Sequence, residues 1–151
     1  MGDDRLFGSS GHDTLFGQQG NDLLFGGGGN DRLVAASGYN ILDGQAGDDI
    51  LVSGTADDIL TGGSGADSFV FKNYSDMTTV TDFTDGVDML DLSDFSDAEI
   101  EAALDSAVQQ NTDTVLTFSN GAVLVLENFD LADLSDEDIL GYESADMMFI
   151  G

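Results

Sequence analysis

The chain has 151 residues, enough for one ordinary domain, and 41% of them are apolar, so a buried core can form. Thirty acidic residues against three basic ones give a formal net charge of −27, which excludes nucleic acid as a partner, because phosphate recognition needs many Lys and Arg side chains. Cysteine is absent, which excludes disulfides and thiolate metal sites, and no apolar run is long enough to predict a membrane span. The opening residues MGDDRLFGSS lack the basic and apolar regions of a secretory signal peptide.

Most of the acidic residues are aspartate: 25 are Asp and five are Glu. Asp is the short carboxylate that suits turns, and carboxylates in loops suit hard cations. At neutral pH, repulsion among so many carboxylates opposes a compact state. The composition therefore predicts that folding needs cations from solution.

A nine-residue repeat runs from residue 8 to residue 70 without a gap, and residues 2–7 fit the second half of a preceding repeat. The fourth position is Gly in every repeat except at Ala56, and glycine there permits a turn with a positive φ. The sixth position supplies an oxygen ligand at constant spacing: Asp4, Asp13, Asp22, Asp31, Asn40, Asp49, Asp58 and Asp67. The eighth position supplies one inward apolar residue: Leu6, Leu15, Leu24, Leu33, Leu42, Leu51, Leu60 and Phe69. Eight units in register exclude a low-complexity linker.

One repeat buries a single leucine and cannot fold alone, so the repeats must stack. Positions seven to nine alternate like a short strand, and turn residues separate successive strands. We expect two repeats to form one coil of an all-β, right-handed parallel β-roll, with the leucines as an internal ladder and the turns stacked along two edges. Carboxylates stacked about 4.8 Å apart repel at low effective dielectric, and a calcium ion between each pair reverses that repulsion. Rows of backbone carbonyls favour calcium over magnesium.

The units resemble the RTX (repeats-in-toxin) nonapeptide G-G-x-G-x-D-x-U-x, in which U is a large apolar residue. The resemblance covers residues 2–70, and residues 65–93 also resemble the segment that closes the β-roll in secreted serralysin-type proteases. The family attaches this module to toxins, proteases, lipases, epimerases and adhesins. The resemblance therefore implies a β-roll that binds several calcium ions, and it implies no single activity.

In the family, one ion lies between a turn and the turn two repeats later. The first turn gives its Asp and the carbonyls of positions two and four, and the second gives its Asp and the carbonyls of positions one and three. Along one edge the resemblance implies three intact pairs: Asp13 with Asp31, Asp31 with Asp49, and Asp49 with Asp67. The implied carbonyls belong, pair by pair, to Ser9, Gly11, Gly26 and Gly28, to Gly27, Gly29, Gly44 and Ala46, and to Gln45, Gly47, Gly62 and Ser64.

The other edge departs from the family pattern. Its implied pairs are Asp4 with Asp22, Asp22 with Asn40, and Asn40 with Asp58. Asn40 brings no charge, Ala35 and Ala36 replace the two leading glycines, and Ala56 replaces a later one. We therefore expect the two sites at Asn40 to be weaker or empty, and the two edges to be unequal.

One further ligand follows from the resemblance. Asp88 matches a family position that helps to bind the last ion. Asp76 and Asp82 are alternatives, because Thr78 stands where the family often has Asp.

Beyond Phe69 the period ends, so we divide one structural unit into a roll (residues 1–70) and a C-terminal cap (residues 71–151). Residues 68–71, 78–83 and 88–93 predict strands, and residues 112–129 predict a hairpin over Asn120-Gly121. Residues 96–110 predict a helix, capped by Ser96 with Glu99. Its expected apolar face is Ile100, Ala103, Leu104, Ala107 and Val108. We expect this region to cover the open end of the roll, as a solenoid requires.

The tail ESADMMFIG resembles the uncleaved C-terminal signal of type I secretion, an acidic segment before a few apolar residues. No nucleophile elbow, zinc-protease helix or phosphate loop occurs, and His12 falls in a variable turn position. We expect a noncatalytic module that drives calcium-dependent folding and type I secretion of a larger extracellular bacterial protein. Its partners are then calcium, the secretion machinery and an upstream domain, because Met1 and Gly2 begin inside a turn, as in a fragment.

A carbohydrate-binding module of a secreted polysaccharide-active enzyme is the alternative, similar to the repeat modules of alginate epimerases. With three basic residues the chain suits a polyanion only where calcium bridges it, and a neutral glycan is less disfavoured. Apolar residues expected on the outer faces fit a neighbouring domain, a ligand or ordinary surface filling: Phe7, Phe16, Leu23, Phe25, Val34, Ile41, Ile50 and Val52.

Overall fold

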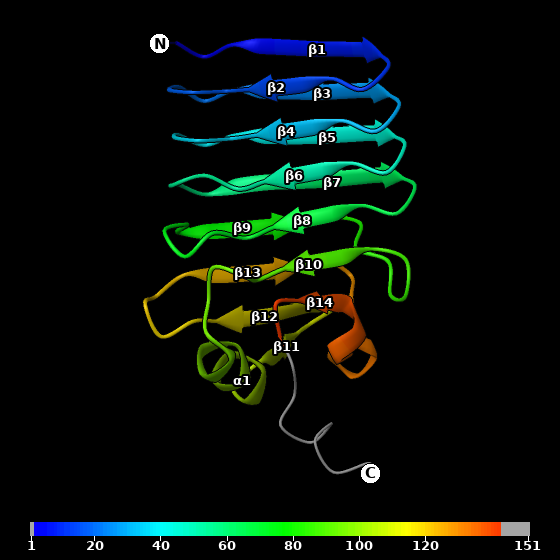
Figure 1. Cartoon of the computed structure of the whole chain (residues 1–151). Helices are drawn as coiled ribbons and strands as arrows, with labels where there is room; N and C mark the ends of the chain where they lie inside the picture. The colour runs from blue at the N-terminus through cyan, green and yellow to red at the C-terminus, as the bar shows by residue number, and fades with distance from the viewer. Residues whose placement is uncertain (1, 143–151) are drawn as a thin grey trace.

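A computed structural model describes residues 2–142 as a β-roll in which two sheets face each other (Figure 1). The chain passes back and forth between the sheets, so that each coil lies directly below the preceding one. The coil closest to the N-terminus is at one end of the roll, and helix α1 (Asp97–Asp105) lies at the other. The predicted all-β parallel roll with one helix in its cap is confirmed.

Sheet one has eight strands in the spatial order β1-β3-β5-β7-β9-β13-β12-β11. Their bounds are, in that order, Arg5–Ser10, Leu23–Gly28, Ile41–Ala46, Asp58–Ser64, Met77–Val80, Val123–Leu126, Asp113–Thr117 and Val108–Gln110. Sheet two has six strands in the order β14-β10-β8-β6-β4-β2. Their bounds are Ile139–Leu140, Met89–Asp91, Ser68–Val70, Ile50–Val52, Arg32–Val34 and Thr14–Phe16.

The register of the strands shows two nonapeptides per coil. In sheet one Leu24 is paired with Leu42, and in sheet two Leu33 is paired with Leu51, each partner being two repeats further along the chain. Beyond residue 70 the sheets continue, since β9 pairs with β7 and β10 pairs with β8. The spacing there lengthens, because Leu60 is paired with Val80 and Phe69 with Leu90.

The core between the sheets is the predicted ladder of position-eight side chains. Leu24, Leu33, Leu42, Leu51 and Leu60 have no exposed surface. Successive residues of a strand point to opposite faces, so one residue per short strand points inward and its neighbours point outward. Each coil therefore adds two leucines to a core that runs along the roll axis.

The cap closes the end of this core with aromatic side chains. Phe71 stacks on Phe95 with ring centroids 5.6 Å apart, and Phe95 stacks on Phe118 at 4.2 Å. Phe83 packs edge-on against Phe129 at 5.2 Å. All five rings are buried, so the open end predicted for an uncapped solenoid is covered.

The predicted hairpin is confirmed as antiparallel strands β12 and β13, and Gly121 in its turn has a φ of 95°. Two short 3₁₀ helices, Leu131–Asp133 and Asp136–Asp138, lead from it to β14. None of the helices within residues 2–142 has the length and apolar character needed to cross a membrane.

The helix prediction is right at its start and wrong at its end. Ser96 and Glu99 form the expected capping box, but the helix stops at Asp105, and Val108 is in strand β11. Val108 pairs with Val115 of the hairpin and is 48% exposed, so it does not join the buried face. The Gln109 side chain, which accepts from the Leu131 backbone N–H, also ties this segment to the cap. Strand pairing in the cap thus overrides a helical pattern.

The expected outer-face residues are outside, with one exception. Phe7, Phe16, Ile41 and Ile50 are exposed, whereas Leu23, Phe25 and Val34 are half-buried. Val52 was expected outside and is 3% exposed, beside the equally covered Val70 of the next strand.

Because the leucine ladder forms the core, a cavity in it is expected to destabilise the roll. Leu42 lies between Leu24 and Leu60 in the ladder. The variant Leu42→Ala is expected to lower the free energy of unfolding by about 2–5 kcal/mol, measured by denaturant titration in calcium. Ile50→Ala removes an exposed side chain and is the control. Equal losses in the two variants would contradict a core made of position-eight residues.

Candidate calcium sites

The turns of the roll stack along two edges, as predicted. Edge one consists of residues 8–13, 26–31, 44–49 and 62–67, each leading from sheet one to sheet two. Edge two consists of residues 17–22, 35–40 and 53–58, which lead back. From Asp22 onward, the sixth residue of each turn accepts, with a carboxylate or amide oxygen, from a backbone N–H of the preceding turn on its edge.

On edge one, from Asp31 onward, one oxygen of each aspartate accepts from the backbone of the preceding turn. The Asp13 N–H donates to Oδ1 of Asp31 at 2.8 Å, and the Asp31 N–H donates to Oδ1 of Asp49 at 2.7 Å. The series continues with Asp49 to Asp67 and Asp67 to Asp88, both at 2.9 Å. At Asp31 and Asp49 only one carboxylate oxygen is used in this way, so these side chains are fixed while their second oxygen is still available.

That second oxygen has no partner at four positions. Oδ2 of Asp13, Asp22, Asp31 and Asp49 is buried and accepts no hydrogen bond. A buried carboxylate oxygen without a partner is strongly unfavourable, and native proteins rarely leave one. A cation in contact with these atoms would remove the penalty, and hard oxygen donors suit calcium.

Backbone carbonyls surround the same gap between turns. A Cβ atom added to Gly27 or Gly29 would collide with the carbonyl oxygen of Ser9 or Gly11, and one added to Gly8 would collide with that of Gly26. The same holds further along edge one for Gly63 and Gly65, which face Gln45 and Gly47. Glycine at these positions leaves room for the carbonyls that are predicted ligands, although Gln45, in register with Gly27 and Gly63, shows that position two also accepts a side chain.

The position-three carbonyls point into the gap as well. The oxygens of Gly28, Ala46 and Ser64 each accept from a glycine N–H of the preceding turn, at 2.7–2.8 Å. A carbonyl has two lone pairs, so this bond leaves one for a cation. Carbonyls at all four predicted positions therefore lie between the turns, and the residues fit calcium; the ligand set itself stays a prediction.

No group of three or more Asp, Glu or His side chains gathers at a single point within residues 2–142. The candidate sites instead combine two carboxylates with several carbonyls. Such a set of many oxygen ligands suits calcium, which is large and accepts flexible coordination. Magnesium is smaller and requires near-ideal octahedral geometry.

Burial and like charges oppose ionisation of the edge-one carboxylates in the absence of a cation. Burial, then repulsion from Asp88 and Asp49, raises the pKa of Asp67 to about 6, although the Asp49 N–H acts in the opposite direction. Burial also raises the pKa of Asp49 and of Asp88. Because the folded-state pKa of Asp67 exceeds its ordinary value, its ionised form opposes folding above about pH 6, and this effect disappears as the pH falls below 4.

Edge two differs from edge one in the hydrogen bonds at Asn40. Nδ2 of Asn40 donates to Oδ1 of Asp58 at 3.0 Å and to the Gly38 carbonyl at 2.7 Å. Oδ2 of Asp58 accepts from the Gly54 N–H at 2.6 Å. The amide thus satisfies both the carboxylate and a carbonyl that the resemblance assigned to the ion between these turns.

Both Asp88 and its predicted alternative Asp82 contact the last edge-one turn, residues 62–67. Asp88 continues the edge-one series, with Oδ1 bound to the Asp67 N–H and Oδ2 to the Thr84 N–H at 2.8 Å. Asp82 instead accepts from the N–H groups of Gly62 and Gly63. Thr78 pairs with Asp58 in sheet one, and its buried hydroxyl has no partner.

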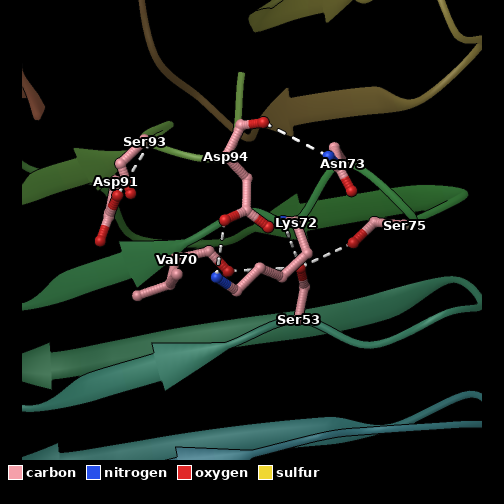
Figure 2. Close-up of polar contacts among 8 residues, drawn as sticks. All are labelled: Ser53, Val70, Lys72, Asn73, Ser75, Asp91, Ser93 and Asp94. Atoms are coloured by element: carbon pink, nitrogen blue, oxygen red, sulfur yellow. Dashed lines mark hydrogen bonds and ion pairs between the residues drawn. The ribbon is translucent and has the colours of Figure 1, made fainter. Parts of the chain in front are cut away.

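Edge two ends in a hydrogen-bonded segment rather than another glycine turn (Figure 2). The Ser53 and Ser75 hydroxyls are 2.8 Å apart, and the Lys72 N–H donates to Ser53 at 3.2 Å. Nζ of Lys72 pairs with Asp94 at 3.1 Å. The sequence gives no sign of this arrangement beyond a lysine in a very acidic chain.

Two features of the turns were not predicted from the sequence. Position five forms its own series, in which the N–H of Tyr39 donates to Asn21 at 3.0 Å and the N–H of Ala66 donates to Asp48 at 2.9 Å. Position two also has a positive φ, 80° at Ser9 and 76° at Gln45. The frequent Asn and Asp at position five are the only signal for the first feature, and nothing in the residue types signals the second.

Asp31 belongs to two predicted edge-one sites, so its carboxylate would contribute a ligand to two calcium ions. Asp31→Asn is expected to reduce the number of bound calcium ions by up to two and to raise the calcium midpoint by about tenfold or more, measured by calorimetric titration. Asp48→Asn, which removes an exposed charge while keeping an acceptor for Ala66, is the control. An unchanged ion count in Asp31→Asn would contradict the edge-one sites.

Replacing Asn40 by aspartate is expected to increase calcium binding on edge two. Asn40→Asp removes the amide donor from Asp58 and restores a carboxylate, so we expect more calcium to bind. In chelator the variant is expected to be less stable by about 1–3 kcal/mol, because Asp58 loses a buried hydrogen bond. Asn30→Asp adds the same charge at an exposed position of edge one and serves as the control. Calorimetry and denaturant titration measure the two effects, and an unchanged ion count would mean that edge two takes no calcium at Asn40.

The comparisons with known proteins agree with this geometry. The family model of the RTX calcium-binding nonapeptide repeat matches residues 1–33, 25–60 and 34–69. No curated protein sequence matches the chain significantly.

Three solved structures are similar. The AlgE6R2 subunit of the Azotobacter vinelandii mannuronan C5-epimerase is 26% identical, with a TM-score of 0.59 over 90% of this chain and 94% of that one. The AlgE6R3 subunit is 20% identical, with a TM-score of 0.55 over 99% of this chain and 83% of that one. The extracellular lipase LipA of Serratia marcescens is 18% identical, with a TM-score of 0.46 over 92% of this chain and 38% of that one. The repeats of this chain belong to the RTX calcium-binding nonapeptide family, and they form its β-roll.

Proposed function

We propose that the chain is a noncatalytic calcium-binding module that folds when calcium binds. The observation that carries this proposal is the set of four buried Oδ2 atoms without a partner. They occur at position six of four turns, three on edge one and Asp22 on edge two, and a backbone carbonyl oxygen of the next turn lies near each of them. A scaffold that was complete without cations would not leave the same atom unsatisfied in turn after turn.

The net charge of the chain explains why folding would depend on calcium. A chain with a net charge of −27 resists compaction, and stacked carboxylates concentrate that resistance along the edges of the roll. Calcium bound only by the folded state contributes its binding free energy to folding. Extracellular modules commonly bind calcium with dissociation constants of about 10⁻⁴–10⁻³ M, so the chain would stay unfolded in a calcium-poor cytosol.

This property suits export of a larger protein. We propose that the module follows an upstream domain in an extracellular bacterial protein, passes through a type I secretion machinery unfolded, and folds outside. The similarity to a subunit of a larger enzyme, the AlgE6R2 subunit, supports a role as an appended module. The predicted secretion signal, residues 143–151, lies outside the described residues.

Glycan binding is the second candidate, favoured by the same similarity to a subunit of a mannuronan C5-epimerase. The charge of the chain disfavours direct binding of a polyanion, so bound calcium would have to bridge it. Affinity electrophoresis in calcium against neutral and anionic glycans separates the candidates: retardation supports glycan binding, and its absence across the panel removes it.

A calcium titration tests the folding switch. Far-UV circular dichroism is expected to show a cooperative transition from coil to β structure at about millimolar calcium, with no transition in magnesium, since the sites rely on many flexible carbonyl ligands. A chain that is fully β-structured in chelator would contradict the proposal and would make calcium an addition to a preformed scaffold.

A further inference from the structure

The outer face of sheet one carries a line of uncharged residues. Leu23, Ile41, Ile59, Thr79, Val125 and Val115 are successive neighbours across strands β3, β5, β7, β9, β13 and β12. We call these six residues the apolar stripe. It runs for about 24 Å across the strands, from the glycine-rich coils into the cap.

The centre of the apolar stripe is open to solvent. Ile41 and Ile59 are 41% and 42% exposed, and Met77 beside them is 39% exposed. Together with Tyr39 they line a groove of about 280 Å³. Contiguous exposed apolar surface with a hollow at its centre is typical of a binding surface, whereas ordinary surface filling leaves apolar residues scattered.

The opposite sheet shows that the repeat does not require such a stripe. The equivalent line on sheet two consists of Thr14, Arg32, Ile50, Ser68 and Met89. A charged and two hydroxyl side chains interrupt it, whereas the position-seven residues Leu23, Ile41 and Ile59 of sheet one are all apolar and only Arg5, beyond Leu23 at the N-terminal end, is charged. The apolar stripe therefore belongs to one face of the roll.

Acidic residues flank the apolar stripe. Three acidic residues each lie two positions from a stripe residue, so their side chains share its face of the sheet. Asp43 and Asp113 are in strands β5 and β12, and Glu127 comes directly after β13. Asp57 lines the groove on the other side. The surface is thus apolar along its centre and negative along its margins.

We propose that the apolar stripe docks a cationic amphipathic segment of a partner protein, with aliphatic side chains on the stripe and Lys or Arg over the acidic margins. Charge complementarity selects this occupant. A second copy of the chain would bring another 27 negative charges, and a neutral ligand would leave the margins unused. The groove borders edge two, because Asn40 and Asp58 also line it, but none of the six stripe residues is a predicted calcium ligand, so the proposal does not depend on the proposed function.

Fluorescence anisotropy with a labelled synthetic peptide tests the proposal in calcium. The peptide alternates Leu and Lys over about ten residues, enough to follow the apolar stripe. We expect saturable binding that weakens by about tenfold or more in the double variant Ile41→Ser, Ile59→Ser, because two exposed aliphatic contacts are lost. Ile50→Ser, at the equivalent position of sheet two and 37% exposed, is the matched control and is expected to bind like the original chain.

Three further probes make the result decisive. Peptides in which Ser replaces Leu, or Glu replaces Lys, are expected not to bind. Equal binding of the Ser-Lys peptide would show simple electrostatic adhesion, and equal weakening by Ile50→Ser would show binding that is not confined to sheet one; either result would overturn the proposal. Displacement of the peptide by a neutral oligosaccharide would assign the surface to a glycan and overturn it as well. Circular dichroism titration of each variant with calcium checks that folding is unchanged.

Discussion

The structure depends on a single side chain used in two ways. At the sixth position of the repeat, one aspartate oxygen accepts a backbone N–H from the neighbouring turn, and the other is held in a buried gap without a partner. The first bond fixes the spacing of the turns, and the spacing in turn brings the carboxylates so close that their charges repel. The hydrogen bond and the repulsion cannot be separated, which is why a cation belongs to the structural argument for this fold.

Glycine, which is usually explained by its conformational freedom, has a further role here. At Gly29 the φ is 111°, as a turn of this kind requires, but the carbonyl of Gly11 also occupies the space of a side chain. Ser9 and Gln45 have a positive φ at position two, so backbone conformation alone does not demand glycine there. At Gly29 the close approach of a carbonyl is added to the positive φ, and that carbonyl is one of those that face the gap between carboxylates.

Much of the fold could be predicted from the sequence because the roll is periodic. Each repeat contacts only its neighbours, so the spacing of Leu24, Leu42 and Leu60 determines the register directly. The cap lacks this advantage. Val108 continues a helical pattern but joins β11, because its partner Val115 is brought near only by the hairpin, and long-range pairing of that kind has no local signature.

The candidate site shows the same division. The positions of Asp13, Asp31 and Asp49 follow from the period alone. The role of Asn40 as a hydrogen-bond donor to Asp58 does not, because the sequence shows an amide and leaves open whether its oxygen or its nitrogen faces the gap. The Lys72–Asp94 pair is equally hidden, since its members are 22 residues apart and outside the repeat.

The unbroken series on edge one has a consequence for how the module responds to calcium. Each inner aspartate, such as Asp31 or Asp49, borders two gaps, so under the proposed function an ion in one gap would order a ligand of the next. Occupancy would then spread along a one-dimensional lattice with favourable nearest-neighbour coupling, and a longer uninterrupted lattice would give a steeper response. The Asn40 amide, bound to Asp58, would break that coupling on edge two. The proposed function therefore implies that cooperativity is set by the longest continuous run of aspartates, and that the total number of repeats matters less.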